Sequence, residues 1–300
     1  MELVVGGSMK RVLLFGAGKF AQKWLQYIKG DICVVAIADN AYREIKTCGG
    51  HLVIAPHDIM NYEFDELIIT LDDLKVGNDA KIINIYAQLI EMGIDDDKIM
   101  LQNLKYYIEN IFHRPRTNYI YSLAEYFNNV GLKGAIAECG VYRGWFSGIL
   151  SDAFVSEKLY LFDSFEGFSS SDLELESPKA KEWVNNGAQK RLSNISQEIV
   201  KLRIRNRVRM VMRKGFVPQT FENINDSFLF VNLDMDLYVP QIEALRWFAP
   251  RMQKGGVILM HDYFNSSLCG TKKAIEDFNG KEFFSIMPIG DLRSIALIRK

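Results

Sequence analysis

The sequence predicts an α/β protein built from two Rossmann-like domains, the second of which is a mostly parallel, doubly wound sheet. A strand, glycine turn and helix occur twice, starting near Arg11 and again near Gly134. Two later apolar runs, Phe228–Val231 and Val257–Met260, end abruptly in polar and acidic residues. A length of 300 residues exceeds one comfortable hydrophobic core, so two domains are expected.

The composition is that of an ordinary soluble globular protein, with 48% hydrophobic and 24% charged residues. A net charge of -1 gives no electrostatic reason to expect nucleic acid or a membrane as a partner. Apolar runs such as Ile32–Ala38 are too short to cross a bilayer, and no signal peptide opens the chain. The four cysteines are scattered without a C-x-x-C pair, which favours a reducing cytoplasm over a disulfide framework or a zinc site.

Four segments are expected along the chain. Residues 1–9 contain a Gly-Gly-Ser run before a second methionine, and we interpret them as a vector-derived leader. Residues 10–103 form the small Rossmann-like domain, 104–130 a linker and helix, and 131–300 the larger domain.

The first glycine turn, Gly16-Ala17-Gly18-Lys19-Phe20-Ala21, matches the dinucleotide-binding pattern G-x-G-x-x-A. Asp39 follows the strand Ile32–Ala38 about 20 residues later, where a ribose-binding acid is required. However, the segment is only half of a full dinucleotide-binding fold, and no catalytic His, Lys or Tyr stands out near it. A structural or oligomerising module is therefore favoured over a working nucleotide site, and NAD is not expected as a cofactor.

Further elements complete this small domain, which resembles the Rossmann-like module fused to some sugar-modifying enzymes and methyltransferases. The expected strands and helix are Leu52–Ile54, Glu66–Thr70, Ala80–Met92 (helix) and Ile99–Leu101. The run His113-Arg114-Pro115-Arg116 marks the domain boundary. We interpret it as a solvated linker, with a substrate-contacting arm as the alternative.

The larger domain opens with a strand that ends in Glu138, followed by a turn containing Gly140 and Gly144 and by a helix. The next strand ends at Asp163, about 25 residues after the first acid. This order is typical of the S-adenosylmethionine form of the βαβ unit. There the glycines admit the methionine and ribose close to the backbone, and the second acid accepts hydrogen bonds from the ribose hydroxyls.

Two polar stretches of this domain have alternative interpretations. The segment from Ser164 to Arg203 is a long insert, favoured as a lid over an acceptor site and otherwise a disordered surface loop. Basic residues occupy every second position from Lys201 to Arg209. A solvated helix end leading into strand Val208–Met212 is favoured over contacts with an anionic acceptor, and a nucleic-acid stripe would carry interleaved aromatics.

Several motifs of the larger domain occur in a fixed order and together resemble the macrocin O-methyltransferase (TylF) family. They are Glu138-Cys139-Gly140-Val141-Tyr142-Arg143-Gly144, Asp163-Ser164-Phe165-Glu166-Gly167-Phe168, Gly215-Phe216, Asp234-Met235-Asp236-Leu237-Tyr238, Gly255-Gly256-Val257-Ile258, His261-Asp262-Tyr263 and Gly270-Thr271-Lys272-Lys273-Ala274. The likeness covers roughly Tyr119 to Lys300. It implies a class I methyltransferase that uses a metal ion to methylate hydroxyls of sugars in antibiotics and other glycosides.

The resemblance also implies a set of site residues. The predicted contacts to S-adenosylmethionine are Glu138, Cys139, Gly140, Tyr142, Gly144, Asp163, Ser164, Phe165, Gly215, Phe216 and Asp236. Mg²⁺ or another divalent metal is expected at Asp234 and Asp262. His261 stands where the family usually has an acid, and imidazole is a softer ligand than Mg²⁺ prefers. It is a third metal ligand, moves out of the shell, or serves as a base.

The chemistry of the residues agrees with this function. A sugar hydroxyl is a poor nucleophile, so the enzyme must favour its alkoxide and align it with the activated methyl group. A cation that chelates two neighbouring hydroxyls achieves both, with Asp234 or His261 accepting the proton. The sequence therefore predicts a metal-assisted O-methyltransferase of a sugar or a glycosylated or nucleotide-linked metabolite. A methyltransferase of a phenolic or phosphoryl acceptor and a non-catalytic scaffold are the alternatives, and a homodimer is expected.

Overall fold

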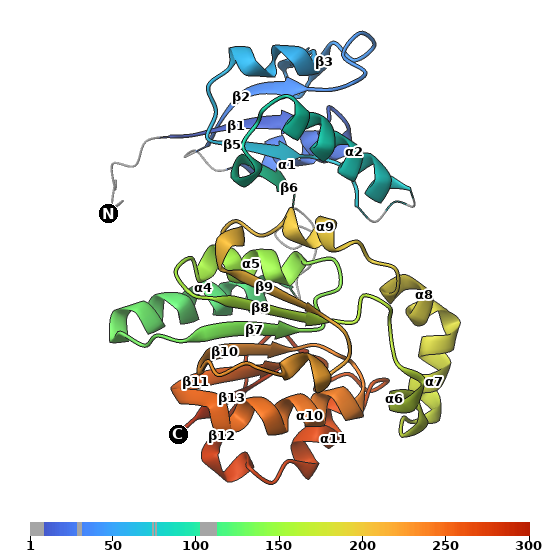
Figure 1. Cartoon of the computed structure of the whole chain (residues 1–300), viewed down its shortest axis with the longest axis vertical. Coiled ribbons are helices and arrows are strands. Elements are labelled where there is room, and N and C mark those ends of the chain that lie inside the picture. The colour runs from blue at the N-terminus through green and yellow to red at the C-terminus, as the bar shows by residue number, and fades with distance from the viewer. Residues whose placement is uncertain (1–8, 29–31, 74, 76, 103–112) are drawn as a thin grey trace. The chain divides into compact units, whose positions relative to one another are not determined.

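The computed structural model describes residues 9–28, 32–73, 75, 77–102 and 113–300. The chain divides into two compact units, Met1–Leu104 and Lys105–Lys300 (Figure 1). Residues 1–8 of the expected leader and 104–112 of the expected linker lie outside the described residues. None of the described helices is both long enough and apolar enough to span a membrane.

The first unit is a six-stranded sheet with the order β3-β4-β2-β1-β5-β6. All strand pairs are parallel except β3 with β4. Apart from β2, β3 and β4, which follow one another directly, helical segments alternate with the strands along the chain in the predicted Rossmann-like pattern. In chain order the elements are β1 (Lys10–Phe15), α1 (Lys19–Tyr27), β2 (Ile32–Ala38), β3 (Thr47–Cys48), β4 (His51–Ile54), η1 (Pro56–Asn61), β5 (Glu66–Ile69), α2 (Asn78–Glu91), η2 (Asp96–Lys98) and β6 (Ile99–Leu101).

The glycine turn of this unit is closed by its own acid. Gly16 adopts a φ of +111°, and a Cβ there would lie 3.1 Å from Oγ1 of Thr70. The two carboxylate oxygens of Asp39 accept hydrogen bonds from the backbone N–H groups of Ala17 and Ala41, each at 2.7 Å. The acid that the pattern assigns to a ribose therefore holds the turn between β1 and α1 together.

The second unit is a seven-stranded sheet with the order β12-β13-β11-β10-β7-β8-β9. β13 runs antiparallel to both of its neighbours, and the other pairs are parallel. This mostly parallel sheet confirms the predicted fold class. The strands are β7 (Ala135–Cys139), β8 (Leu159–Asp163), β9 (Met210–Lys214), β10 (Phe228–Leu233), β11 (Met252–Met260), β12 (Phe284–Pro288) and β13 (Ile295–Arg299).

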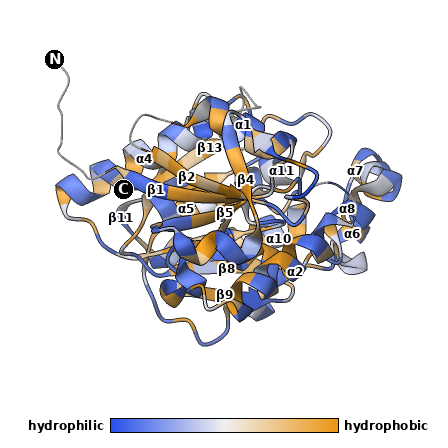
Figure 2. Ribbon diagram, turned by 90° about the horizontal axis from the view of Figure 1, so that it is seen from above, coloured by the Kyte–Doolittle hydropathy of each residue, from blue (hydrophilic) through white to orange (hydrophobic). Residues whose placement is uncertain are grey.

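Helices connect these strands and pack along the sheet (Figure 1). The longer ones are α4 (His113–Val130), α5 (Trp145–Ala153), α10 (Tyr238–Phe248) and α11 (Gly270–Asp277). An insert between β8 and β9 holds α6 (Ser170–Glu174), α7 (Pro178–Trp183), the π-helical turn η3 (Val184–Ala188), α8 (Gln189–Leu192) and α9 (Gln197–Lys201). Short 3-10 turns are η4 (Arg207–Arg209), η5 (Gln219–Phe221), η6 (Ala249–Arg251) and η7 (Lys281–Phe283). In Figure 2 the α6–α8 segment is drawn largely in hydrophilic colours.

Aromatic side chains fill the core beneath α10. The ring of Phe248 lies 4.9 Å from that of Phe228, 5.1 Å from that of Phe221 and 6.1 Å from that of Phe162, all edge to face. Phe248 itself is completely buried. Edge-to-face rings gain energy beyond the area they bury, so this cluster anchors α10 and the strand ends beside it.

Two interpretations of basic residues are each wrong at one residue. Arg116 lies in the first turn of α4 and is 1% exposed, so the solvated linker does not extend to it. In the alternating basic run, Arg203 is 2% exposed and its Nε donates to the carbonyl of Arg143 at 3.0 Å. The strand begins at Met210, and Val208 is 89% exposed. Buried acceptors therefore decide the positions of Arg116 and Arg203, which sequence spacing alone does not reveal.

We expect Phe248→Ala to lower the free energy of unfolding of the second unit by about 3–5 kcal/mol, because it empties the centre of the aromatic core. Urea denaturation followed by tryptophan fluorescence measures this. The control is Phe283→Ala, which removes a half-exposed ring and should cost under about 1 kcal/mol. Equal losses in the two variants would contradict the packing described here.

Candidate active site

The site lies where the strand order of the second sheet reverses. The chain leaves β7 for β8 on one side and returns to β10 on the other, and ligands of open α/β sheets bind at such a point, beyond the carboxyl ends of the strands. Glu138 is the next-to-last residue of β7, and Asp163 ends β8. Asp234 follows β10, and His261 follows β11.

A first cavity opens at the carboxyl ends of β7 and β8. Its lining includes seven of the residues predicted to contact the cofactor, namely Gly140, Tyr142, Asp163, Ser164, Gly215, Phe216 and Asp236. Phe168, Leu192 and Met235 add apolar surface to the same wall. The structure therefore brings most of the predicted cofactor set into one cavity.

Four of the predicted cofactor residues do not line this cavity. Glu138, Cys139 and Phe165 are buried, each less than 3% exposed. Gly144 precedes α5 with a φ of +76°, and a Cβ there would lie 3.0 Å from Cγ1 of Val200. These four residues pack beneath the glycine turn and the strand ends and do not face the cavity.

Asp163 ties the glycine turn to β8. Its two carboxylate oxygens accept hydrogen bonds from the backbone N–H groups of Tyr142, at 2.8 Å, and Phe165, at 2.6 Å. Both donors belong to residues with positive φ, 52° and 55°, which bulky side chains adopt only when their surroundings hold them there. Burial raises the pKa of Asp163, while these backbone donors oppose that rise.

Glu138 is a buried acid with two side-chain neighbours. Ser147 donates a hydrogen bond from Oγ to Oε2, and Nδ2 of Asn232 lies 3.5 Å from Oε1. Burial raises the pKa of Glu138 to about 8, against the effect of the Ser147 bond and the charge of Arg116, which lower it. At neutral pH, in the absence of a ligand, the proton is therefore mostly retained on this carboxyl group.

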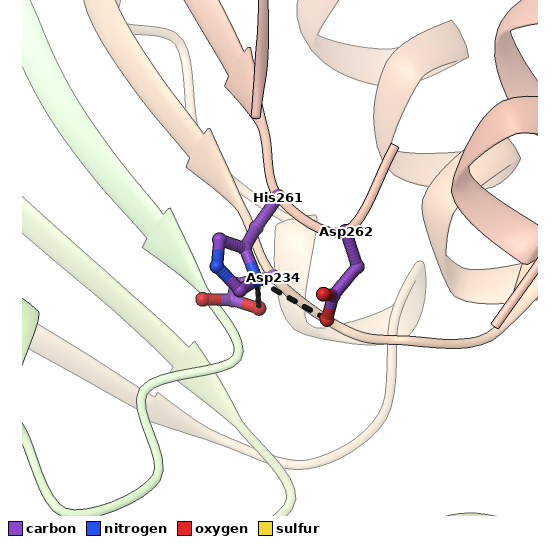
Figure 3. A group of neighbouring side chains, drawn as sticks. All are labelled: Asp234, His261 and Asp262. Atoms are coloured by element: carbon purple, nitrogen blue, oxygen red, sulfur yellow. Dashed lines mark ion pairs between the residues drawn. The ribbon is translucent and has the colours of Figure 1, made fainter. Parts of the chain in front are cut away.

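The second part of the site is a triad of Asp234, His261 and Asp262 (Figure 3). Nδ1 of His261 lies 3.0 Å from Oδ1 of Asp234 and 3.2 Å from Oδ2 of Asp262. One ligand atom from each residue lies within 4.8 Å of the others. Although Nδ1 is buried and close to both carboxylates, it makes no hydrogen bond of acceptable geometry. The three groups face a common point, as ligands of one cation do.

The protonation of each group in the triad depends on the charge of the other two. Burial and the charge of Arg116 lower the pKa of His261, but the carboxylates of Asp234 and Asp262 together outweigh them and raise that pKa to about 9. Burial acts to raise the pKa of Asp262, but His261 holds it well below its usual range. Without a metal, the imidazolium is thus the positive charge between the two carboxylates. A divalent cation at the same point would release this proton, because a ligating imidazole must be neutral.

Arg116 is a site residue that the sequence reasoning did not assign. Its Nη2 donates to Oδ1 of Asn232 at 2.6 Å, and both Nη1 and Nη2 lie 3.3 Å from Oδ2 of Asp234. Its guanidinium also stacks on the ring of Phe146, 4.0 Å from the ring centre. The sequence did hold one sign of such a residue. Asn232 is a lone amide within the apolar strand β10, and a buried amide needs a hydrogen-bond partner.

A second cavity lies beside the triad. It is lined by Trp183, Arg191, Leu192, Asp234, Asp236, His261, Asp262, Asn265, Leu268 and Arg293. Leu192, Asp234 and Asp236 line the first cavity as well, so the two cavities meet at these side chains. Of the triad, Asp234 therefore stands at this junction, where a group could pass from one bound molecule to another.

The insert between β8 and β9 contributes to both cavities. It is helical, and Gln189 in α8 fixes its end by accepting from Phe168 N–H at 2.8 Å and donating to the Glu166 carbonyl at 3.1 Å. Trp183 and Arg191 of the insert line the second cavity only. The alternative of a disordered surface loop is wrong, and the position beside the triad suits the predicted lid.

A sequence model described as "Macrocin-O-methyltransferase (TylF)" matches residues 110–289. The chain belongs to the macrocin O-methyltransferase family. It is a class I methyltransferase that transfers a methyl group from S-adenosylmethionine to oxygen. A second model, described as "C2185-like, N-terminal", matches residues 8–100, which correspond to the first unit.

Solved structures of methyltransferases share the fold of this TylF-family chain. The O-methyltransferase NovP is 20% identical with a TM-score of 0.54, over 62% of this chain and 80% of NovP. The calicheamicin methyltransferase CalS11 is 18% identical with a TM-score of 0.52, over 76% of this chain and 97% of CalS11. No curated protein sequence matches the chain.

We expect Gly140→Ala to weaken binding of S-adenosylhomocysteine by more than about 10-fold, which corresponds to 1.4 kcal/mol. A Cβ at Gly140, where φ is +87°, would collide with the carbonyl of Asp234, with 2.6 Å to its carbonyl carbon. The matched control is Gly131→Ala, which also has positive φ but finds no atom within 4 Å of the new Cβ. In the control, the free energy of unfolding should fall by about 1–2 kcal/mol, while the affinity for S-adenosylhomocysteine should stay unchanged. Calorimetric titration distinguishes the two outcomes.

The raised pKa of Glu138 predicts a pH dependence of stability. A carboxyl group whose pKa rises to about 8 on folding binds a proton more tightly in the folded state. Its burial therefore lowers the free energy of unfolding least at acidic pH, where the group is neutral in both states. The ligand-free protein should therefore lose stability as pH rises from about 5 to about 9. In Glu138→Gln that loss should be reduced, as thermal unfolding at a series of pH values would show. An unchanged slope in the variant would exclude Glu138 as its source.

Proposed function

We propose that this enzyme methylates a hydroxyl of a sugar, or of a glycosylated or nucleotide-linked metabolite, with the help of a divalent cation held by Asp234, His261 and Asp262. The observation that carries the proposal is the convergence of three ligand atoms in the second cavity, with Asp234 at its junction with the first. One cavity suits S-adenosylmethionine, and the other is left for the acceptor.

The residues fit a divalent cation. Two carboxylates supply the oxygen ligands that Mg²⁺ and Mn²⁺ prefer. Nδ1 of His261 is buried between the two carboxylates, 3.0 and 3.2 Å from them, without a hydrogen bond of good geometry, so its lone pair can serve as the third ligand once the proton is released. Because imidazole favours transition metals over Mg²⁺, the donor set suits Mn²⁺ at least as well.

Each half of the site has a separate task in the transfer. The cation, when bound, would lower the pKa of the acceptor hydroxyl and fix its direction. Asp234 belongs to both cavities, so its carboxylate is within reach of an acceptor hydroxyl and can take up its proton. Leu192 lines both cavities and adds an apolar side chain at the same junction. His261 is the alternative proton acceptor.

The walls of the second cavity support a sugar-type acceptor. Trp183 offers a flat aromatic surface against which the apolar face of a sugar ring can pack. The guanidinium of Arg191 lies 5.8 Å from the centre of that ring, and Arg293 contributes a second positive charge, with Nη1 3.3 Å from Oδ1 of Asp262. Guanidinium groups bind phosphates well, which suits a nucleotide-linked sugar.

The proposal also includes the cellular compartment and the partners of the enzyme. All four cysteines are free thiols, as suits a reducing cytoplasm. A small molecule is the expected partner, and a homodimer stays a prediction of the sequence.

We expect Asp234→Asn to reduce methyl transfer by about 100-fold or more, because the amide is a weaker ligand and accepts no proton. Binding of S-adenosylhomocysteine should change by less than about 10-fold, since the cofactor cavity has many other walls. Transfer from labelled S-adenosylmethionine to a panel of sugar nucleotides and glycosides measures the first quantity, and calorimetry the second.

The matched control is Glu222→Gln, which neutralises an exposed acid of the same unit outside both cavities. It should transfer methyl groups like the wild type. Full activity of the wild type in excess EDTA would refute the metal, and a wild type that binds no S-adenosylhomocysteine would refute the assignment of the first cavity.

A further inference from the structure

Arg116 places a buried positive charge directly behind the triad. It comes from the first turn of α4, more than 100 positions earlier in the chain than the acid it approaches. Its side chain is 1% exposed, whereas that of Asp234 is 22% exposed. Burying a guanidinium is costly unless charged and polar partners surround it, so its position needs a reason.

The contacts of Arg116 give the Asp234 carboxylate a direction. Oδ2 of Asp234 lies 3.3 Å from both terminal nitrogens of the guanidinium. The other oxygen, Oδ1, lies 3.0 Å from Nδ1 of His261 on the side of the triad. One oxygen therefore faces the protein interior, and the other faces the point where the ligand atoms converge.

The guanidinium is itself held in place. Nη2 donates to Oδ1 of Asn232 at 2.6 Å, and the guanidinium lies over the ring of Phe146 at 4.0 Å. Asn232 is completely buried, and its Nδ2 lies 3.5 Å from Glu138. The amide thus accepts on one side and donates on the other, which fixes its own orientation. The planar fork of an arginine can bridge an amide and a carboxylate at once, whereas a lysine ammonium is a single point charge.

We propose that Arg116 is a positioning residue that holds Asp234 with Oδ1 directed at the cation and so sets the metal affinity of the site. This inference rests on the proposed metal-assisted function. Partners that orient a metal ligand in this way typically account for 10–100-fold in affinity or activity.

An opposite effect competes with this role. A positive charge near a metal site repels the incoming cation, so its removal would tighten binding if repulsion were the larger effect. Orientation is expected to dominate, because the loss of Arg116 leaves Oδ2 of Asp234 without its guanidinium partner and frees the carboxylate to rotate toward His261. The sign of the change in metal affinity therefore distinguishes the two effects.

The test measures binding of Mn²⁺ to the full-length protein by electron paramagnetic resonance, for the wild type, Arg116→Met and Arg116→Lys. We expect both variants to bind Mn²⁺ at least about 10-fold more weakly than the wild type. Affinity for S-adenosylhomocysteine should stay within about threefold of the wild-type value. In assays over a range of acceptor concentrations, kcat should fall while the KM for the acceptor changes less. A general loss of structure would lower all of these quantities together.

Arg203→Lys is the matched control, because Arg203 is equally buried but bonds the Arg143 carbonyl and not the triad. It should lose thermal stability and keep its Mn²⁺ affinity. If Arg116→Met does not fold, Arg116→Lys, which keeps the charge, decides the question. Unchanged or tighter Mn²⁺ binding by a folded Arg116 variant would overturn this proposal alone. Absence of Mn²⁺ binding by the wild type would overturn the metal site and this proposal together.

Discussion

The close approach of two backbone turns is the constraint on which the site depends. Gly140 follows β7, and its N–H bonds the carbonyl of Phe162 in β8 at 2.9 Å. On the other side, Asp234 N–H bonds the carbonyl of Cys139 at 2.8 Å. A side chain at position 140 would not fit between them. Because the glycine turn after β7 and the turn that carries Asp234 touch through backbone atoms, a shift of one turn displaces the other.

Much of the fold follows from local patterns, since buried parallel strands are short apolar runs with sharp ends. Ile32–Ala38 and Ile99–Leu101 were predicted with the bounds that the structure shows. The edge strand β12 was not predicted, because most of its side chains are exposed and Pro288 ends it, so its sequence carries little apolar signal. The strand is defined by its pairing with β13 and not by its own composition.

The site was predictable only where its residues adjoin the strands that place them. Acids at strand ends are visible in the sequence, so Asp163, Asp234 and Asp262 were found. Arg116 was missed because its position is decided by contacts with residues more than 100 positions away, and a basic residue beside a proline ordinarily marks a solvated boundary. Asp39 illustrates the converse case. It fits a nucleotide-binding pattern, yet its two oxygens accept bonds from the backbone N–H groups of Ala17, in the glycine turn, and of Ala41. A motif records residue types, whereas binding depends on which atoms remain available.

The shared wall of the two cavities also bears on how such an enzyme can diversify. Leu192, Asp234 and Asp236 border both cavities, so under the proposed function a change at any of them affects the transfer to every acceptor. Trp183 and Arg191 border the second cavity alone and belong to the insert, apart from the strands that hold the triad. Under the proposed function, substitutions at Trp183 and Arg191, unlike one at Leu192 of the same insert, can therefore alter the choice of acceptor in a lineage while the residues shared by the two cavities stay as they are.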